Sequence, residues 1–147
     1  MKFIYITLIF MLFTTSVKAE KLTIYTYDSF VSEWGPGPII KKQFEKNYGI
    51  DLELVAVDSA ATLLNKVILE GKNTKADIVL GLDMNLFDIA KESNLFDKHS
   101  LTNLNEKLNL PISWDSNIFV PYNFGYFAFV YNNKNLDTPP KSMDELI

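Results

Sequence analysis

The sequence contains no cysteine, no arginine and a single histidine, His99. Without cysteine there is no disulfide framework and no cysteine nucleophile. One histidine in a polar context (KHS) leaves little on which to build a Ser-His-Asp triad or a histidine metal site. The basic residues are all lysines and are scattered along the chain, whereas binding to phosphate backbones needs a clustered basic surface. We therefore expect no nucleic-acid partner.

The first nineteen residues have the pattern of a secretory signal. Lys2 supplies the positive start, residues 3–13 an apolar run too short to span a bilayer, and Val17 and Ala19 the small residues before a cleavage site. We expect cleavage before Glu20 and a periplasmic product. Residues 20–147 carry 12 lysines against 18 carboxylates, a formal charge of -6. The full chain of 147 residues is 48% hydrophobic and 22% charged, which is ordinary globular composition and suffices for one domain with a core.

The prediction of the fold starts from residues 22–38, LTIYTYDSFVSEWGPGP. This stretch begins as a strand with β-branched and aromatic residues on both faces, which is typical of a strand covered on each side. It then reaches a polar and aromatic tip and a glycine-proline turn. Apolar residues every four positions, at Ile40, Phe44 and Tyr48, predict an amphipathic helix that ends at Gly49.

Two further strand-helix units follow. Residues 51–57 predict a strand, after which Asp58 or Ser59 caps a helix whose apolar stripe is Leu63, Leu64, Val67 and Ile68. Residues 77–82 predict a third strand that ends at Asp83, and residues 85–93 a short helix packing Leu86, Ile89 and Ala90. This alternation indicates an α/β fold with a mainly parallel sheet and helices on both faces.

The remaining sequence is less regular. Residues 95–116 predict irregular structure with one helical turn, and the aromatic residues 118–131 predict two strands broken near Tyr122 to Gly125. Ser142 and Glu145 form a capping box that opens a helix. Because that helix has barely begun at Ile147, we expect the chain to be truncated, either as a fragment or as a remnant.

Ligands of open parallel sheets bind at the carboxyl ends of the strands. Those ends carry Tyr27-Asp28-Ser29, Asp58-Ser59 and Asp83, with the Trp34 loop able to fold over them, and no lysine lies in these clusters. Carboxylates and aromatic rings attract cations, so we expect a cationic, ring-containing small molecule. The competing interpretation is that Asp83 and Asp58 simply cap helices, which is favoured for Asp83 and evenly balanced for Asp58.

Four stretches together resemble the periplasmic thiamine-binding proteins of ABC importers, which are type II solute-binding proteins. The resemblance runs from about residue 22 to the end of the chain, on YTYDSF, WGPGP with Lys41-Lys42, LLNKVILEGKNTKADIVLGLDMNL and VPYNFGYFAFVY. It implies two α/β lobes that close on thiamine, of which residues 20–147 form the first. It also implies delivery to a membrane permease.

By this resemblance Tyr27 and Trp34 contact the thiamine rings, and the Ser59-Ala60 pair contacts the ligand too. The family commonly has an acid where Ser59 stands, so either Asp58 takes that role or an ion pair is lost. With Asp83 added from the strand-end clusters, the expected ligand set is Tyr27, Trp34, Asp58, Ser59, Ala60 and Asp83. Because the second lobe is missing from this sequence, we expect weak or no thiamine binding by the chain, and we expect a monomer.

Three alternatives remain open at this point. A ferric-ion or polyamine receptor would share the scaffold. An enzyme would use Asp28, Asp58 or Asp83 as acid or base, but no usual pair of nucleophile and base can be assembled, so we predict that the chain is not an enzyme. We expect no cofactor, with thiamine or its phosphates as the transported ligand.

Overall fold

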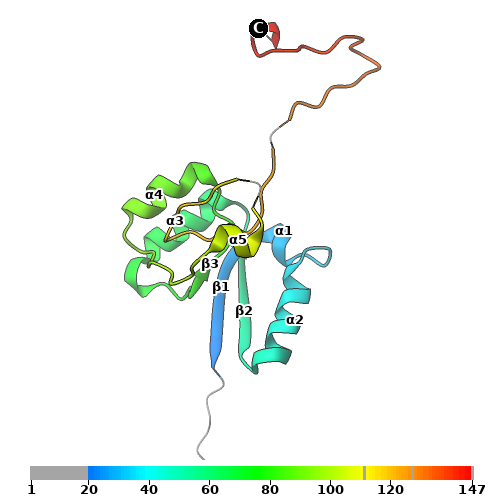
Figure 1. Cartoon of the computed structure of the whole chain (residues 1–147). Helices are drawn as coiled ribbons and strands as arrows, with labels where there is room; N and C mark the ends of the chain where they lie inside the picture. Colours follow the sequence, from blue (N-terminus) through cyan, green and yellow to red (C-terminus); the bar gives the residue numbers. More distant parts are fainter. Residues whose placement is uncertain (1–19, 111, 127, 147) are drawn as a thin grey trace, which may run out of the picture. The chain divides into compact units, whose positions relative to one another are not determined.

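The computed structural model describes residues 20–110, 112–126 and 128–146 (Figure 1). The predicted signal peptide, residues 1–19, lies outside the described residues. The chain divides into two units, one ending at Lys98 and one beginning at His99. Each unit is described by itself below.

A three-stranded parallel sheet forms the centre of the first unit. Its strands are β1 (Lys21–Tyr27), β2 (Asp51–Val57) and β3 (Ile78–Val79), in the spatial order β2-β1-β3. The register pairs Lys21 with Asp51 through to Tyr27 with Val57, and Ile24 with Ile78. The predicted parallel α/β fold is confirmed.

The third strand is shorter than predicted. Only Ile78 and Val79 are strand residues, instead of residues 77–82. Flanking hydrogen bonds join Asp77 N to Thr23 O and Leu80 N to Tyr25 O, each at 2.9 Å. Gly81 then has φ of +111°, which takes the chain out of the extended conformation and ends the pairing.

Three helices of this unit, α2, α3 and α4, lie close to the predicted positions, whereas the short helix α1 was not predicted. They are α1 (Asp28–Val31), α2 (Gly37–Tyr48), α3 (Ala60–Glu70) and α4 (Phe87–Glu92), with short 3-10 turns η1 (Gly71–Asn73) and η2 (Met84–Leu86). Gly49 ends α2 in the left-handed conformation, as its position in the sequence predicts. Ile89 was expected to pack, but it is exposed, and Ala90 is the buried residue of α4. No helix among the described residues is long and apolar enough to cross a membrane.

Both faces of β1 are covered. Ile24 and Tyr25 are neighbours, so their side chains point to opposite faces, and both are buried. Tyr25 packs against Leu63 and Val67 of α3. In Figure 1, α2 lies beside β2, whereas α3 and α4 lie toward β3. The helices thus cover the sheet on both sides.

A group of polar contacts fixes α2 to β2. Lys41 Nζ lies 2.6 Å from Glu45 Oε1 and also donates to the Leu52 carbonyl, while Leu52 N donates to Glu45 Oε1 at 3.1 Å. The hydrogen bond to Glu45 raises the pKa of Lys41. Hydrogen bonds from Lys41 and from the Leu52 amide lower the pKa of the Glu45 carboxyl. The folded state therefore stabilises the ionised forms of both Lys41 and Glu45.

The second unit contains α5 (Leu104–Leu108) and η3 (Asp144–Leu146). The Asn105 side chain makes two hydrogen bonds to the backbone of Trp114, of 2.8 and 3.0 Å, which fix the irregular segment around the predicted helical turn. At η3, the Ser142 hydroxyl accepts from Glu145 N and the Glu145 carboxylate accepts from Lys141 N, a variant of the predicted capping box.

The two strands predicted within residues 118–131 are wrong for this structure. Residues 118–126 and 128–131 contain no strand, and their larger apolar side chains from Val120 onward are exposed, Val130 at 96%, while Ile118 and Phe119 are half-buried. A strand exists only when its backbone groups pair with a neighbouring strand, and none of the described residues pairs with this segment. The high β propensity of this segment alone was not enough to form a strand.

We predict that Glu45→Gln removes a pH-dependent part of the stability. Because the folded-state pKa of Glu45 lies below its ordinary value of 4.5, the contribution is present above that value and is lost as pH falls through the folded-state pKa. The free energies of unfolding in urea of the wild type and the variant should differ at pH 7 and differ less at pH 3. Glu92→Gln, on the exposed surface of α4, is the control. A difference that is the same at both pH values would contradict the assignment.

We also predict that Thr26→Val stabilises the chain by about 1 kcal/mol, because a buried hydroxyl without a partner is costly. Thr26 is 0% exposed, and its Oγ1 has no hydrogen-bond partner among the described residues. Thr23→Val on the same strand is the matched control, since Thr23 Oγ1 donates to Glu53 Oε2. The midpoint temperature of thermal unfolding should rise for Thr26→Val and should not rise for Thr23→Val. Equal shifts for both would mean that the Thr26 hydroxyl is satisfied.

Candidate functional site

The strand ends of β1 and β2 lie side by side because the two strands are parallel and in register. Tyr27 pairs with Val57, so the next residues along each chain, Asp28 and Asp58, leave the sheet at the same edge. On the other side of β1, Val79 pairs with Tyr25, which brings Gly81 to the level of Tyr27. The structure therefore brings together the ends that the sequence predicted as the ligand-binding edge.

Tyr27 is held by contacts from two elements. Its ring meets the buried Phe30 of α1 edge-on, with ring centroids 5.9 Å apart and planes at 66°. Gly81 approaches the same ring so closely that a Cβ there would lie 2.2 Å from Tyr27 Cδ1. Tyr27 is half-buried, so part of the ring stays accessible at the strand end.

Trp34 lies in a tight turn between α1 and α2. Ser32 N donates to Asp28 O at 3.1 Å, and Gly35 N donates to Ser32 O at 2.9 Å, which close the turn on both sides of Trp34. Gly35 packs directly on the carbonyls of Ser29 and Phe30. The indole is 80% exposed although the backbone beneath it is fixed. A large apolar side chain held in solvent by an ordered turn is suited to contact a ligand.

The structure separates the roles of Asp58 and Ser59. Ser59 is the N-cap of α3: its Oγ accepts from Thr62 N at 3.2 Å and contacts Thr62 Oγ1 at 2.9 Å. Asp58 is exposed, and its carboxylate makes no hydrogen bond or ion pair within the described part of the chain. Ala60 is the first residue of α3 and is half-buried. The cap is therefore Ser59, which leaves the Asp58 carboxylate available.

Asp83 is used as a cap. Its Oδ1 accepts from Asn85 N at 2.9 Å at the start of η2. The side chain is exposed, so its second carboxylate oxygen faces solvent. This contact is the helix cap that the sequence analysis favoured for Asp83.

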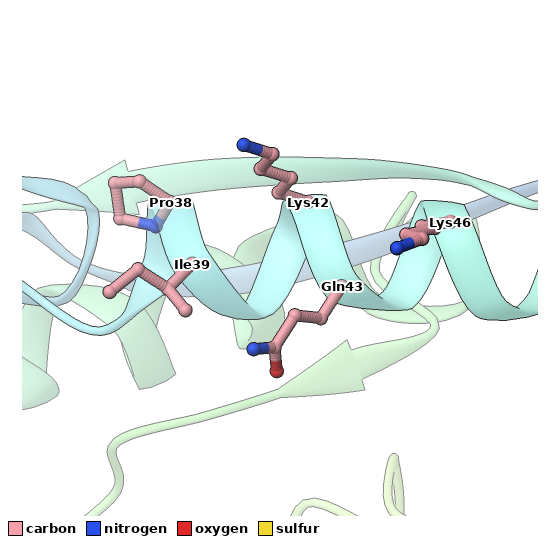
Figure 2. A pocket seen from close by; sticks show the side chains of 5 residues that line it. All are labelled: Pro38, Ile39, Lys42, Gln43 and Lys46. Carbon is pink, nitrogen blue, oxygen red and sulfur yellow. The ribbon is translucent and has the colours of Figure 1, made fainter.

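A separate surface hollow of about 460 Å³ lies on α2 (Figure 2). All five of its lining side chains come from that helix: Pro38, Ile39, Lys42, Gln43 and Lys46. None belongs to the predicted site, and two lysine ammonium groups repel a cation. This hollow does not suit a cationic ligand. In the described part of the chain, no three His, Cys, Asp or Glu side chains converge on a possible metal position.

Comparisons with known proteins bear on this arrangement. The thiamine-binding periplasmic protein of Escherichia coli (strain K12) is 47% identical over 126 residues, which cover 86% of this chain and 38% of that protein. The Brucella abortus protein of the same name is 51% identical over 128 residues, covering 87% and 38%. That of Haemophilus influenzae is 43% identical, covering 100% and 45%. No family model matches the chain.

A solved structure decides the fold. A periplasmic thiamin binding protein superposes with a TM-score of 0.76 at 48% sequence identity, over 89% of this chain and 41% of that one. The predicted resemblance to the thiamine-binding periplasmic proteins is confirmed. The chain spans less than half the length of these thiamine-binding relatives.

Two features of this strand-end edge were not predicted from the sequence. One is the ring contact of Phe30 with Tyr27, and the other is the close approach of Gly81. The Phe30 contact had no signal in the sequence. A glycine inside the apolar run 78–82 was a usable signal, because such a glycine often marks a close approach of backbone to another group.

We predict that only one of two neighbouring substitutions destabilises the chain. Ser59→Ala should lower the free energy of unfolding by about 1 kcal/mol, because it removes the N-cap of α3. Asp58→Asn should leave it unchanged within about 0.5 kcal/mol, as for an exposed residue without partners. Chemical unfolding of both variants measures this. If Asp58→Asn is the destabilising change, Asp58 is structural and its availability to a ligand is disproved.

Proposed function

We propose that residues 20–147 are the first lobe of a periplasmic receptor that binds thiamine, and that they supply one side of its site. The observation that carries the proposal is the 43–51% identity to thiamine-binding periplasmic proteins over at least 86% of the chain. Residues 1–19 would direct export, and a membrane permease would receive the ligand. The receptor would act as a monomer, without a cofactor and without changing the ligand chemically.

The chemistry of the strand-end edge supports this choice of ligand. Thiamine has a permanently cationic thiazolium ring and a flat aminopyrimidine ring. Tyr27 and Trp34 offer ring faces, which attract a cation through the quadrupole and stack on a flat ring. Asp58 offers a carboxylate that no described residue neutralises. These groups match a cationic ring compound better than they match an anion.

Ser59, Ala60 and Asp83 have different parts in the proposal. Ser59 Oγ is engaged with Thr62, so its contact with a ligand would come through its backbone or through a shared hydrogen bond. Ala60 would contact the ligand by its methyl group or by its backbone N–H, which lies in the first turn of α3. Asp83 keeps one carboxylate oxygen free beside its capping bond and would add negative charge to the edge.

Thiamine binding to two variants tests the proposal. Trp34→Ala should weaken binding by about 1–3 kcal/mol, the range for losing a ring that covers a cation together with its buried area. Asp58→Asn should weaken binding more at low salt than at high salt, because an exposed ion pair is screened. Calorimetry or an NMR titration of the purified chain with thiamine measures both.

Leu69→Ala, an equally exposed apolar residue on α3, is the control and should leave the affinity unchanged. We expect the wild-type affinity to be weaker than about 1 μM, because binding to one side of a site forgoes the contacts of the other. Tighter binding would disprove this expectation. Ferric ion or spermidine that binds at the same residues and is not displaced by thiamine would favour the alternative receptors and contradict the proposal.

A further inference from the structure

Gly81 satisfies two requirements at once. Its φ of +111° lies in a region that residues other than glycine rarely adopt. In addition, a Cβ at this position would lie 2.2 Å from Tyr27 Cδ1 and 2.5 Å from Tyr27 Cε1. Both distances are far inside van der Waals contact, so a larger residue forces the ring to move.

The other glycines with positive φ differ in this respect. Gly49 and Gly71, with φ of +69° and +53°, have nothing within 4 Å of a Cβ. Their conformation alone accounts for glycine there. The steric requirement is thus specific to Gly81 among the positive-φ glycines of the described chain, and its target is a predicted ligand contact.

A displaced Tyr27 ring has little room on its inner side. Phe30, which meets the ring edge-on, is 1% exposed, and Gly37 packs on it so closely that a Cβ would lie 2.5 Å from the Phe30 carbonyl oxygen. Close-packed interiors yield little to an added methyl group. The ring must therefore turn toward its exposed side, at the strand-end edge.

We infer that Gly81 is a positioning residue for ligand binding: its missing side chain fixes the Tyr27 ring in the orientation that receives the cationic ring of the ligand. This inference rests on the proposed function. Gly81 itself touches no ligand in this account. It acts by the space that it leaves at the end of β3.

Gly81→Ala tests the inference, with Gly71→Ala as the matched control for backbone strain. Two-dimensional NMR of the whole chain should show cross-peaks between the Gly81 α protons and the Tyr27 ring protons. In Gly81→Ala the Tyr27 ring resonances should shift, and thiamine affinity should fall about tenfold, the equivalent of losing one good cation-π contact. Gly71→Ala should keep both the ring resonances and the affinity.

A double mutant separates binding from packing. In a Tyr27→Ala background, adding Gly81→Ala should cause no further loss of thiamine affinity, because no ring remains to be displaced. An unmoved ring in Gly81→Ala, or equal losses of affinity in Gly81→Ala and Gly71→Ala, would overturn the role of Gly81 alone. A wild-type chain with the predicted cross-peaks but no response to thiamine would instead overturn the proposed function, and the role of Gly81 in binding with it.

Discussion

The parallel pairing of β1 with β2 is the constraint on which the rest of the structure depends. Seven consecutive residue pairs align the two strands from Lys21 with Asp51 to Tyr27 with Val57. A shift of one residue would turn Tyr25 away from α3 and would separate the residues that follow the strands. The register therefore sets both the core and the edge at which polar groups meet. The contacts of Lys41 and Glu45 with Leu52 stabilise α2 against the outer strand of this pair.

Positions after the strands divide into those that serve the fold and those left free. Ser59 caps α3, and Asp83 caps η2. Asp58 and the Trp34 indole cap no helix in the described structure. The Tyr27 ring is held by Phe30 and Gly81, but the residue remains half-buried. A receptor site needs this division, since a carboxylate consumed by a helix cap has less to offer a ligand. We propose that the Asp58 carboxylate, the exposed Trp34 indole and the accessible part of the Tyr27 ring together favour a cationic ligand.

The sequence predicted most of the first unit because its signals are local. Apolar periodicity and Gly49 defined α2, and residues 51–57 match β2 as observed. The sequence offered two candidates for the N-cap of α3, Asp58 and Ser59, and the structure shows that Ser59 is the cap. The failures have non-local causes. β3 ends early because the chain leaves the extended conformation at Gly81, beside the Tyr27 ring of β1, and the aromatic residues at 118–131 lack a neighbouring strand among the described residues. The Gly81 contact depends on register, which no single stretch of sequence specifies.

The central claim is that thiamine docks at the carboxyl ends of β1 and β2. Intermolecular NMR cross-peaks between thiamine protons and the side chains of the chain test it most directly, since they locate even a weakly bound ligand. We predict cross-peaks from thiamine to the rings of Tyr27 and Trp34. Cross-peaks confined to Ile39 and the lysine side chains on the outer face of α2, or to the exposed aromatic residues beyond Tyr122, would contradict it.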